Sequence, residues 1–244
     1  MALPIEDITS NGLRARIIRP ERPGKAGILF LPHWPGIDEG SVEECQWLAS
    51  EGFTVLAWDP FSAYPPDIDA KERRRLTRGP ITDENARKEQ SHWLGYMRQE
   101  LGLEHVGGIG FCMGGRMGLA LGVTDPRLEC YSAFYATLRM PVPEYALPVV
   151  DMAPEIKCPI QVHYPGLDES TSYETFVALR SALERRPGNP PTLAHYYPKA
   201  VHGFLGHERQ GEPDNAAATK LSKALTIAFF RACLIPSPAA AGEG

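Results

Sequence analysis

The chain has 244 residues, of which 43% are hydrophobic and 23% are charged. This composition is typical of a globular protein, and the length suffices for one large domain with a single core. The formal net charge of -5 argues against a nucleic-acid-binding protein, which would need a basic surface. The one basic cluster, residues 71–75, is short, and we interpret it as a solvated helix face. No stretch approaches the ~20 apolar residues of a membrane span.

The five cysteines are scattered along the chain and include no C-x-x-C pair. An odd, scattered set argues against a disulfide framework and against a structural zinc site. The first ten residues include Glu6 and Asp7 and no long apolar run, unlike a signal peptide. We therefore expect a soluble cytoplasmic protein that binds no nucleic acid, membrane or metal.

The first quarter of the chain predicts two strands and a helix. Residues 13–19 alternate apolar and basic side chains, as in an edge strand. Residues 26–31 form a continuous apolar run, which is typical of a strand buried on both faces of a parallel sheet. Ser41 and Glu44 have the spacing of a capping box, which predicts a helix that ends near Ser50.

The rest of the chain alternates strand-like and helix-like segments. The expected strands are 53–58, 106–109, 129–135, 159–164 and 193–197. The expected helices are 67–78, 84–102, 113–122, 172–184 and 215–234. Because strands alternate with helices and no repeat is visible, we expect an α/β fold with one doubly wound, mostly parallel sheet flanked by helices. This single domain should span residues 1–235, with a flexible C-terminal tail at 236–244.

The most informative stretch runs from Gly110 through Phe111, Cys112 and Met113 to Gly114. It lies between an expected strand and an expected helix, where a G-x-S-x-G elbow exposes a nucleophile above an α/β sheet. Two glycines without Cβ atoms allow the close chain approach that such a turn requires, and the helix N-terminus favours a thiolate and then an oxyanion. Cys112 is therefore the candidate nucleophile. The alternative is a buried structural cysteine in a Gly-rich turn.

A thiol with an ordinary pKa of ~8.5 is mostly protonated near neutrality, so it needs a base, and the base needs an orienting acid. In this fold both follow the nucleophile in chain order, on loops at the carboxyl ends of later strands. Residues 165–168 present Asp168 after one expected strand, and residues 198–204 present His202 after the next. Each could be an ordinary loop residue, but their joint order after Cys112 predicts a catalytic triad.

With these motifs the chain resembles the dienelactone hydrolase family of α/β hydrolases, from about Gly24 to Leu234. The resemblance rests on the segments 110–115, 165–168 and 197–204. It implies a single-domain α/β-hydrolase fold and the hydrolysis of small carboxylic esters or lactones through a thioester acyl-enzyme. It implies no cofactor and a small-molecule substrate as the only partner, whether the chain is a monomer or a homodimer.

The family roles carry over onto matching positions of this chain. Cys112 would attack the ester carbonyl, His202 would take and return the proton, and Asp168 would fix the imidazole. The backbone N–H groups of Met113 and Trp34 would hold the oxyanion. Aromatic side chains that could line an apolar pocket, or belong to the core instead, are Trp34, Phe61, Tyr64, Trp93 and Tyr135.

Two departures from the family pattern leave the natural substrate open. His33 stands where the founding enzymes carry a thiol-activating Glu, and it either activates Cys112 or packs in its loop. Gly206 stands where they carry an Arg that binds the substrate carboxylate, and Arg209 is a candidate replacement. These departures motivate an alternative function, a hydrolase-like protein that binds a small molecule with little turnover. The proline-rich segment 137–154 is expected to be irregular and to pass near the site or cover it.

Overall fold

The computed structural model describes residues 2–235, which form a single α/β domain built on an eight-stranded sheet. The strand order is β1-β2-β4-β3-β5-β6-β7-β8. β2 pairs antiparallel with β1 and β4, and every other pair of neighbours is parallel. The expected doubly wound, mostly parallel sheet is confirmed. The predicted flexible tail at 236–244 lies outside the described residues.

Strands and helices alternate along the chain much as the sequence predicts. The strands are β1 (Ile5–Ser10), β2 (Leu13–Ile18), β3 (Ala26–Leu31), β4 (Thr54–Trp58), β5 (His105–Phe111), β6 (Tyr131–Phe134), β7 (Ile160–Leu167) and β8 (Thr192–Val201). The α-helices are α1 (Glu39–Ser50), α2 (Ala70–Leu76), α3 (Asp83–Gln99), α4 (Met113–Thr124), α5 (Val149–Met152), α6 (Tyr173–Glu184) and α7 (Pro213–Leu234). Two single-turn 3₁₀ helices are η1 (Ala153–Glu155) and η2 (His207–Arg209).

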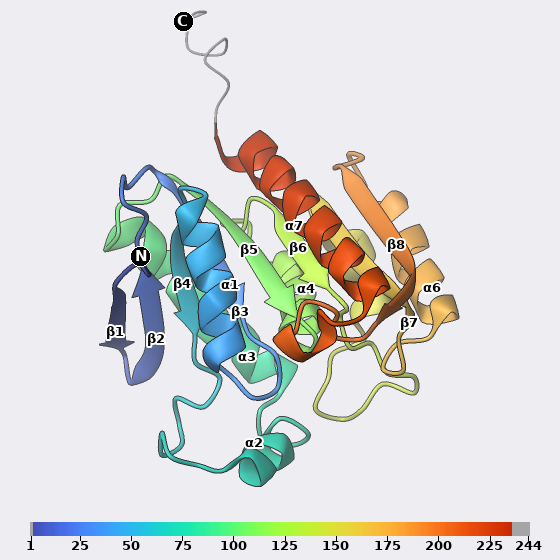
Figure 1. The fold of residues 1–244 in the computed structure, drawn as a ribbon, viewed down its shortest axis with the longest axis horizontal. Coiled ribbons are helices and arrows are strands. Elements are labelled where there is room, and N and C mark those ends of the chain that lie inside the picture. The colour runs from blue at the N-terminus through green and yellow to red at the C-terminus, as the bar shows by residue number, and fades with distance from the viewer. Residues whose placement is uncertain (1, 236–244) are drawn as a thin grey trace, which may run out of the picture.

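Helices cover both faces of the sheet (Figure 1). α1 and α7 lie on the face toward the viewer, and α3, α4 and α6 pack on the other. Along β3, Ile28 and Phe30 join the core under α1 and α7, whereas Leu29 and Leu31 join the core on the opposite face. Because successive side chains of a strand point to opposite faces, a strand between two helical layers must be apolar throughout. No helix of residues 2–235 has both the length and the apolarity needed to cross a membrane.

The prediction that residues 13–19 form an edge strand is wrong in one respect. The strand exists as β2, but β1 pairs along its outer side and is the true edge. Asn11 and Gly12 join the two strands with φ angles of 53° and 75°, the left-handed conformation of a tight hairpin turn. β1 is largely exposed and carries polar side chains, so it has too weak an apolar alternation to be predicted from sequence.

The predicted cap of α1 is also wrong. Asp38 is the N-cap, and its carboxylate accepts from the backbone N–H of Ser41 at 2.9 Å. Ser41 lies inside the helix and donates its hydroxyl to the carbonyl of Gly36 at 3.1 Å. Glu44 pairs with Lys223 of α7 at 3.1 Å instead of capping the helix. An aspartate three residues before Ser41 begins the helix because its charged side chain caps the free amides well.

The segment expected to be irregular over 137–154 is partly helical. It has no helix or strand from 137 to 148, but α5 and η1 follow. Pro148 immediately precedes α5 as its N-cap, where a missing N–H costs the helix nothing. The irregular part leaves β6 at the carboxyl edge of the sheet, at the lower side of Figure 1, close to α2.

Candidate active site

Cys112 occupies a sharp turn between β5 and α4. Its φ of 56° and ψ of -110° are a strained backbone conformation for a residue with a side chain. The backbone N–H of Cys112 donates to the carbonyl of Phe134 at 3.0 Å, and its own carbonyl accepts from the N–H of Thr137 at 3.0 Å. The turn is therefore fixed to the end of the neighbouring strand β6, and the thiol is held at the carboxyl edge of the sheet.

The two flanking glycines make this turn sterically possible. A Cβ atom at Gly110 would overlap the hydroxyl of Tyr131, and a Cβ atom at Gly114 would overlap the carbonyl of Leu31. The hydroxyl of Tyr131 donates to the carbonyl of Gly114 at 2.7 Å. Only glycine fits at both positions, as the elbow motif predicts. The N-terminus of α4 is thereby brought against the end of β3.

His202 and Asp168 come from the loops after β8 and β7 and meet at the thiol. Nδ1 of His202 lies 2.9 and 3.0 Å from the two carboxylate oxygens of Asp168. The imidazole of His202 and the thiol of Cys112 line the same cavity. The side chain of Asp168 is fully buried and accepts from the backbone N–H groups of Ser170 at 2.7 Å and Thr171 at 3.2 Å. The carboxylate is therefore held in place by its own turn and can orient the imidazole.

The local electrostatics favour a charged sulfur–imidazole pair. Burial opposes ionisation of the thiol, but the hydrogen bond and charge of His202, with Thr137 and His33, lower the pKa of Cys112 to about 7. Burial also opposes the imidazolium, but hydrogen bonds to Asp168 and Cys112 outweigh it and raise the pKa of His202 to about 10. Between these values the pair is a thiolate and an imidazolium, the state in which sulfur is a strong nucleophile.

The loop after β3 places Trp34 at the site and turns His33 to another partner. Nε2 of His33 lies 2.9 Å from the carboxylate of Asp38, the N-cap of α1. Burial raises the pKa of Asp38, but the hydrogen bond and charge of His33 outweigh it and lower that pKa to about 2. His33 thus acts on Cys112 through its charge and is hydrogen-bonded to Asp38. Among residues 2–235, the backbone N–H groups of Met113 and Trp34 donate to no other residue.

A cavity of about 180 Å³ opens above the thiol. Its lining residues are Trp34, Arg74, Thr77, Arg78, Cys112, Met113, Arg116, Thr137, Arg139, Tyr145, Ser170 and His202. Arg74, Arg78 and Arg139 are exposed at its mouth, and none of them pairs with a carboxylate of the described chain. Arg74 lies over the ring of Trp34, with its guanidinium carbon 4.8 Å from the ring centre. The mouth of the cavity is therefore positively charged although the whole chain is acidic.

The model of the dienelactone hydrolase family matches residues 13–234. The chain belongs to the dienelactone hydrolase family. A relative named "Putative carboxymethylenebutenolidase" from Salmonella typhi is 26% identical over 190 residues, which cover 75% of this chain and 68% of that protein. The resemblance seen in the sequence motifs is thus confirmed.

Solved structures of dienelactone hydrolase-like proteins have the same fold. One, titled "Putative Dienelactone Hydrolase" and from Klebsiella pneumoniae, superposes with a TM-score of 0.78 at 22% identity and covers 94% of this chain and 99% of that one. Another is a dienelactone hydrolase-like promiscuous phosphotriesterase from metagenomic libraries, with a TM-score of 0.75 at 21% identity, covering 96% and 99% of the two chains. At these identities the structures show the α/β-hydrolase fold alone.

Not every residue that the sequence suggested for substrate binding in this dienelactone hydrolase family member lies at the cavity. Trp93 is completely buried in the core between the sheet and α3, so the prediction that it contacts substrate is wrong. Tyr64 packs against the same core, and its carbonyl accepts from Arg14 at 3.0 Å. Arg209 is exposed on η2, 3.8 Å from Glu208, and does not line the cavity. Helical spacing predicts that a side chain lies on the apolar face of a helix, but it does not distinguish the protein core from a substrate pocket.

Tyr135 packs against His202 and does not line the cavity. Its ring is 5.2 Å from that of His202, centre to centre, in an edge-on arrangement. It is buried, and together with His33 it lines a smaller neighbouring hollow of about 60 Å³. The side chain of Tyr135 therefore packs against the imidazole without lining the cavity at Cys112.

Sequence reasoning missed the residues that attach the proline-rich segment to the site. Arg116 of α4 and Asp83 of α3 form a buried two-point ion pair at 2.8 Å. Asp83 also accepts from the N–H of Leu147 at 2.9 Å, and Arg116 donates to the carbonyl of Thr137 at 3.3 Å. Asp83 directly precedes the helix expected at 84–102, and no periodicity or motif in the sequence points to a partner 33 residues away.

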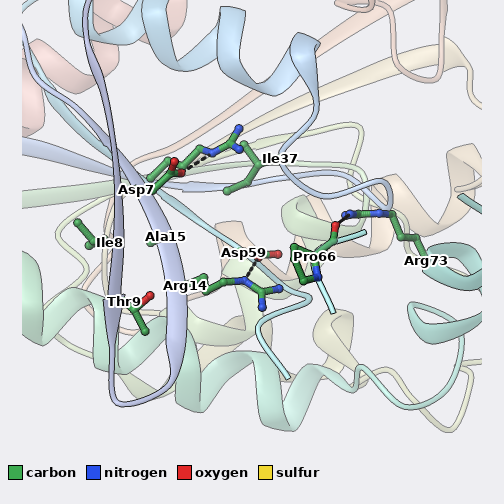
Figure 2. Close-up of a pocket in the computed structure, with 10 residues that line it drawn as sticks. Asp7, Ile8, Thr9, Arg14, Ala15, Ile37, Asp59, Pro66 and Arg73 are labelled. Carbon is green, nitrogen blue, oxygen red and sulfur yellow. Dashed lines mark hydrogen bonds and ion pairs between the residues drawn. The ribbon is translucent and has the colours of Figure 1, made fainter. Parts of the chain in front are cut away.

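A second hollow, of about 340 Å³, lies between the N-terminal hairpin and the segment after β4. Figure 2 shows Arg14 joined to Asp59, and Arg73 turned toward Pro66. Arg73 donates to the carbonyls of Pro66 and Pro35, both at 3.0 Å. Arg14 and Arg73 are thus bonded to other residues of the chain, and Arg73 links α2 to the loop that carries Trp34. None of the residues lining this hollow lines the cavity at Cys112.

Proposed function

We propose that the chain hydrolyses small carboxylic esters or lactones, with Cys112 as nucleophile and His202 as the group that transfers protons. One arrangement supports this proposal: His202, hydrogen-bonded to Asp168, lines the same cavity as a thiol on a strained strand–helix turn and lowers the pKa of that thiol. The same three roles support acyl transfer on several unrelated folds. Membership of the dienelactone hydrolase family makes an ester or lactone bond the natural target.

In the first half of the reaction, the thiolate of Cys112 attacks the carbonyl carbon of the ester. A carbon–sulfur bond forms, and the π electrons of the carbonyl move onto its oxygen, which the N–H groups of Met113 and Trp34 hold. The tetrahedral intermediate collapses and breaks the bond to the alkoxy oxygen. His202 donates its proton to that oxygen, so the alcohol leaves and a thioester remains on Cys112.

In the second half, water replaces the alcohol. Neutral His202 accepts a proton from water while the water oxygen attacks the thioester carbon, and the same N–H groups hold the second oxyanion. Collapse breaks the carbon–sulfur bond, which regenerates the thiolate of Cys112 and the imidazolium. The carboxylic acid product is released and gives up its proton to bulk water. With a lactone, the alcohol and the acid are the two ends of one opened ring.

The charge at the cavity mouth supports a substrate with a negative group. Arg78 and Arg139 are free to donate hydrogen bonds to such a group, which is worth more than a neutral contact. A double substitution of Arg78 and Arg139 with glutamine should raise KM for a carboxylate-bearing aryl ester about tenfold. KM for the matched neutral ester should change less than about twofold, since it lacks the group that the arginines would bind.

The test of the proposed function uses 4-nitrophenyl acetate and mass spectrometry of rapidly quenched protein. We expect an acetyl group on Cys112 during turnover and a fall in kcat/KM of at least about 10³-fold in Cys112→Ala. Cys130→Ala, a buried cysteine away from the cavity, is the matched control and should keep its activity. Full activity in Cys112→Ala would remove this residue as nucleophile. Saturable ester binding without turnover or acylation would favour the binding-protein alternative.

A further inference from the structure

Thr137 is the one hydroxyl-bearing residue of the described chain that forms a hydrogen bond with the sulfur of Cys112. Its Oγ1 lies 3.1 Å from Sγ although the two residues are 25 positions apart. Thr137 is buried, and within residues 2–235 its hydroxyl forms no other hydrogen bond. The proposed ester hydrolysis does not by itself call for this contact.

The backbone around Thr137 is fixed directly to the elbow. Tyr135, two residues before it, has a φ of 35°, a strained conformation that turns the chain sharply at the end of β6. From there the N–H of Thr137 donates to the carbonyl of Cys112 at 3.0 Å, and its carbonyl accepts from Arg116 at 3.3 Å. Both anchors belong to the elbow turn and to α4, so Thr137 moves with the nucleophile.

A second anchor comes from the turn that carries the triad acid. The hydroxyl of Thr171 donates to the carbonyl of Ala136 at 2.8 Å and accepts from the N–H of Leu138 at 2.7 Å. The N–H of Thr171 donates to Asp168 at 3.2 Å. The residues on either side of Thr137 are therefore held by the same turn that orients the acid. The position of its hydroxyl relative to the sulfur is set by both loops.

We infer that Thr137 is a positioning residue that donates its hydroxyl hydrogen to the sulfur of Cys112 and stabilises the thiolate facing His202. A thiolate has no hydrogen and can only accept, so in the ionised state the hydroxyl of Thr137 must be the donor. A hydrogen bond to a charged acceptor is stronger than one to a neutral thiol, so the contact favours the ionised form. The inference rests on the proposed role of Cys112 as nucleophile.

Several charged or titratable groups surround the sulfur from other elements. They are His33 after β3, Arg74 and Arg78 on and after α2, Arg116 on α4, Tyr135 and Arg139 after β6, and His202 after β8. Replacing Thr137 with valine alters none of these groups and preserves side-chain shape while removing the donor. Any change in ionisation of the thiol in that variant therefore reports on the hydroxyl.

The experiment measures the rate of iodoacetamide alkylation of the Cys112 peptide by mass spectrometry across pH. In Thr137→Val we expect the midpoint of the rate to rise by about one pH unit, which makes alkylation about tenfold slower near pH 6. Near pH 9 the two rates should agree within about twofold, because the thiol is then ionised in both proteins. Ester hydrolysis should follow the same pattern, with a loss of kcat/KM that shrinks as pH rises.

Two further variants distinguish the loss of the hydroxyl of Thr137 from a general disturbance of the fold. Thr137→Ser keeps the donor and should restore the midpoint to that of the unmodified protein. Thr77→Val makes the same change in a residue of the same cavity whose hydroxyl donates to the carbonyls of Arg73 and Arg74, and it should leave the midpoint unchanged. An unchanged midpoint in Thr137→Val, or a loss equal at all pH values, would overturn the inference. The proposed function would fail separately, through an inert Cys112 in the unmodified protein.

Discussion

Cys112 and Cys130 flank two neighbouring parallel strands, one at the carboxyl end and the other at the amino end. Cys112 follows the carboxyl end of β5, and Cys130 precedes the amino end of β6. The first thiol is partly exposed, and its pKa is lowered to about 7 against the opposing effect of burial. The second is completely buried, and burial raises its pKa well above the ordinary value for a thiol.

The difference between the two thiol pKa values comes from the groups that surround each sulfur at its end of the strands. At the carboxyl edge the loops after β3, β6, β7 and β8 converge, and they supply an imidazole, a carboxylate and a hydroxyl donor to Cys112. At the other edge Cys130 packs near Gly107 and Leu234, and its polar neighbours are other thiols and Glu129. A cysteine can thus have a lowered pKa or be packed as a core residue according to its place in the sheet.

The largest expected effect concerns the imidazole. His202→Gln should lower kcat/KM for a small aryl ester by about 10³-fold, because the thiol loses both its ion-pair partner and its proton carrier. The matched control is His195→Gln, on β8, a partly exposed ring that contacts Gln161 at 3.1 Å, and its activity should stay within about twofold. Equal losses of kcat/KM in the two variants would mean that His202 has no special role in the reaction.

The next effect concerns thiol reactivity. Near pH 7 iodoacetamide should alkylate Cys112 about 10²-fold faster than Cys130 or Cys45, because burial raises the pKa of both other thiols well above its ordinary value. Peptide mass spectrometry over a time course measures the three rates in one sample. Similar rates at all three positions would contradict the assignment of a poised thiol to the elbow.

The pH dependence of hydrolysis should follow the ionisation of the pair. In the proposed mechanism the thiolate attacks the ester, so protonation of Cys112 below about pH 7 should lower kcat/KM, tenfold per pH unit at the limit. Above about pH 10 loss of the imidazolium proton of His202 should lower it again. Cys130→Ala should leave both limbs in place. A profile that rises steadily from pH 6 to pH 10 would indicate a nucleophile with an ordinary thiol pKa.

The smallest effect concerns stability, where the substitution of Cys130 should matter more than that of Cys112. Cys130→Ala should lower the free energy of unfolding by about 1–2 kcal/mol, since it leaves a small cavity in a filled core. Cys112→Ala should lower it by less, because this side chain borders an open cavity. Thermal unfolding of both variants provides the comparison. A greater loss in Cys112→Ala would mean that the thiol serves the fold more than the chemistry.

Much of the fold follows from local patterns in the chain. The apolar run of β3 and the alternation of strands with helices predicted the layered sheet because each is a direct consequence of burial on two faces. The elbow at Cys112 was visible because only glycine tolerates the contacts on either side of it. β1 and the N-cap Asp38 were missed, since one has little apolar character and the other competed with a nearby Ser that has similar capping propensity.

The sequence by itself predicted the candidate nucleophile, base and acid as an ordered set, because their motifs are short and each follows its own strand. Only the tertiary structure decided their surroundings: the hydroxyl of Thr137 at the sulfur, the Arg116–Asp83 pair, and the core position of Trp93. These depend on contacts between residues far apart in the chain. Local spacing fixes which face a side chain points to, whereas the packing of whole layers fixes what it meets there.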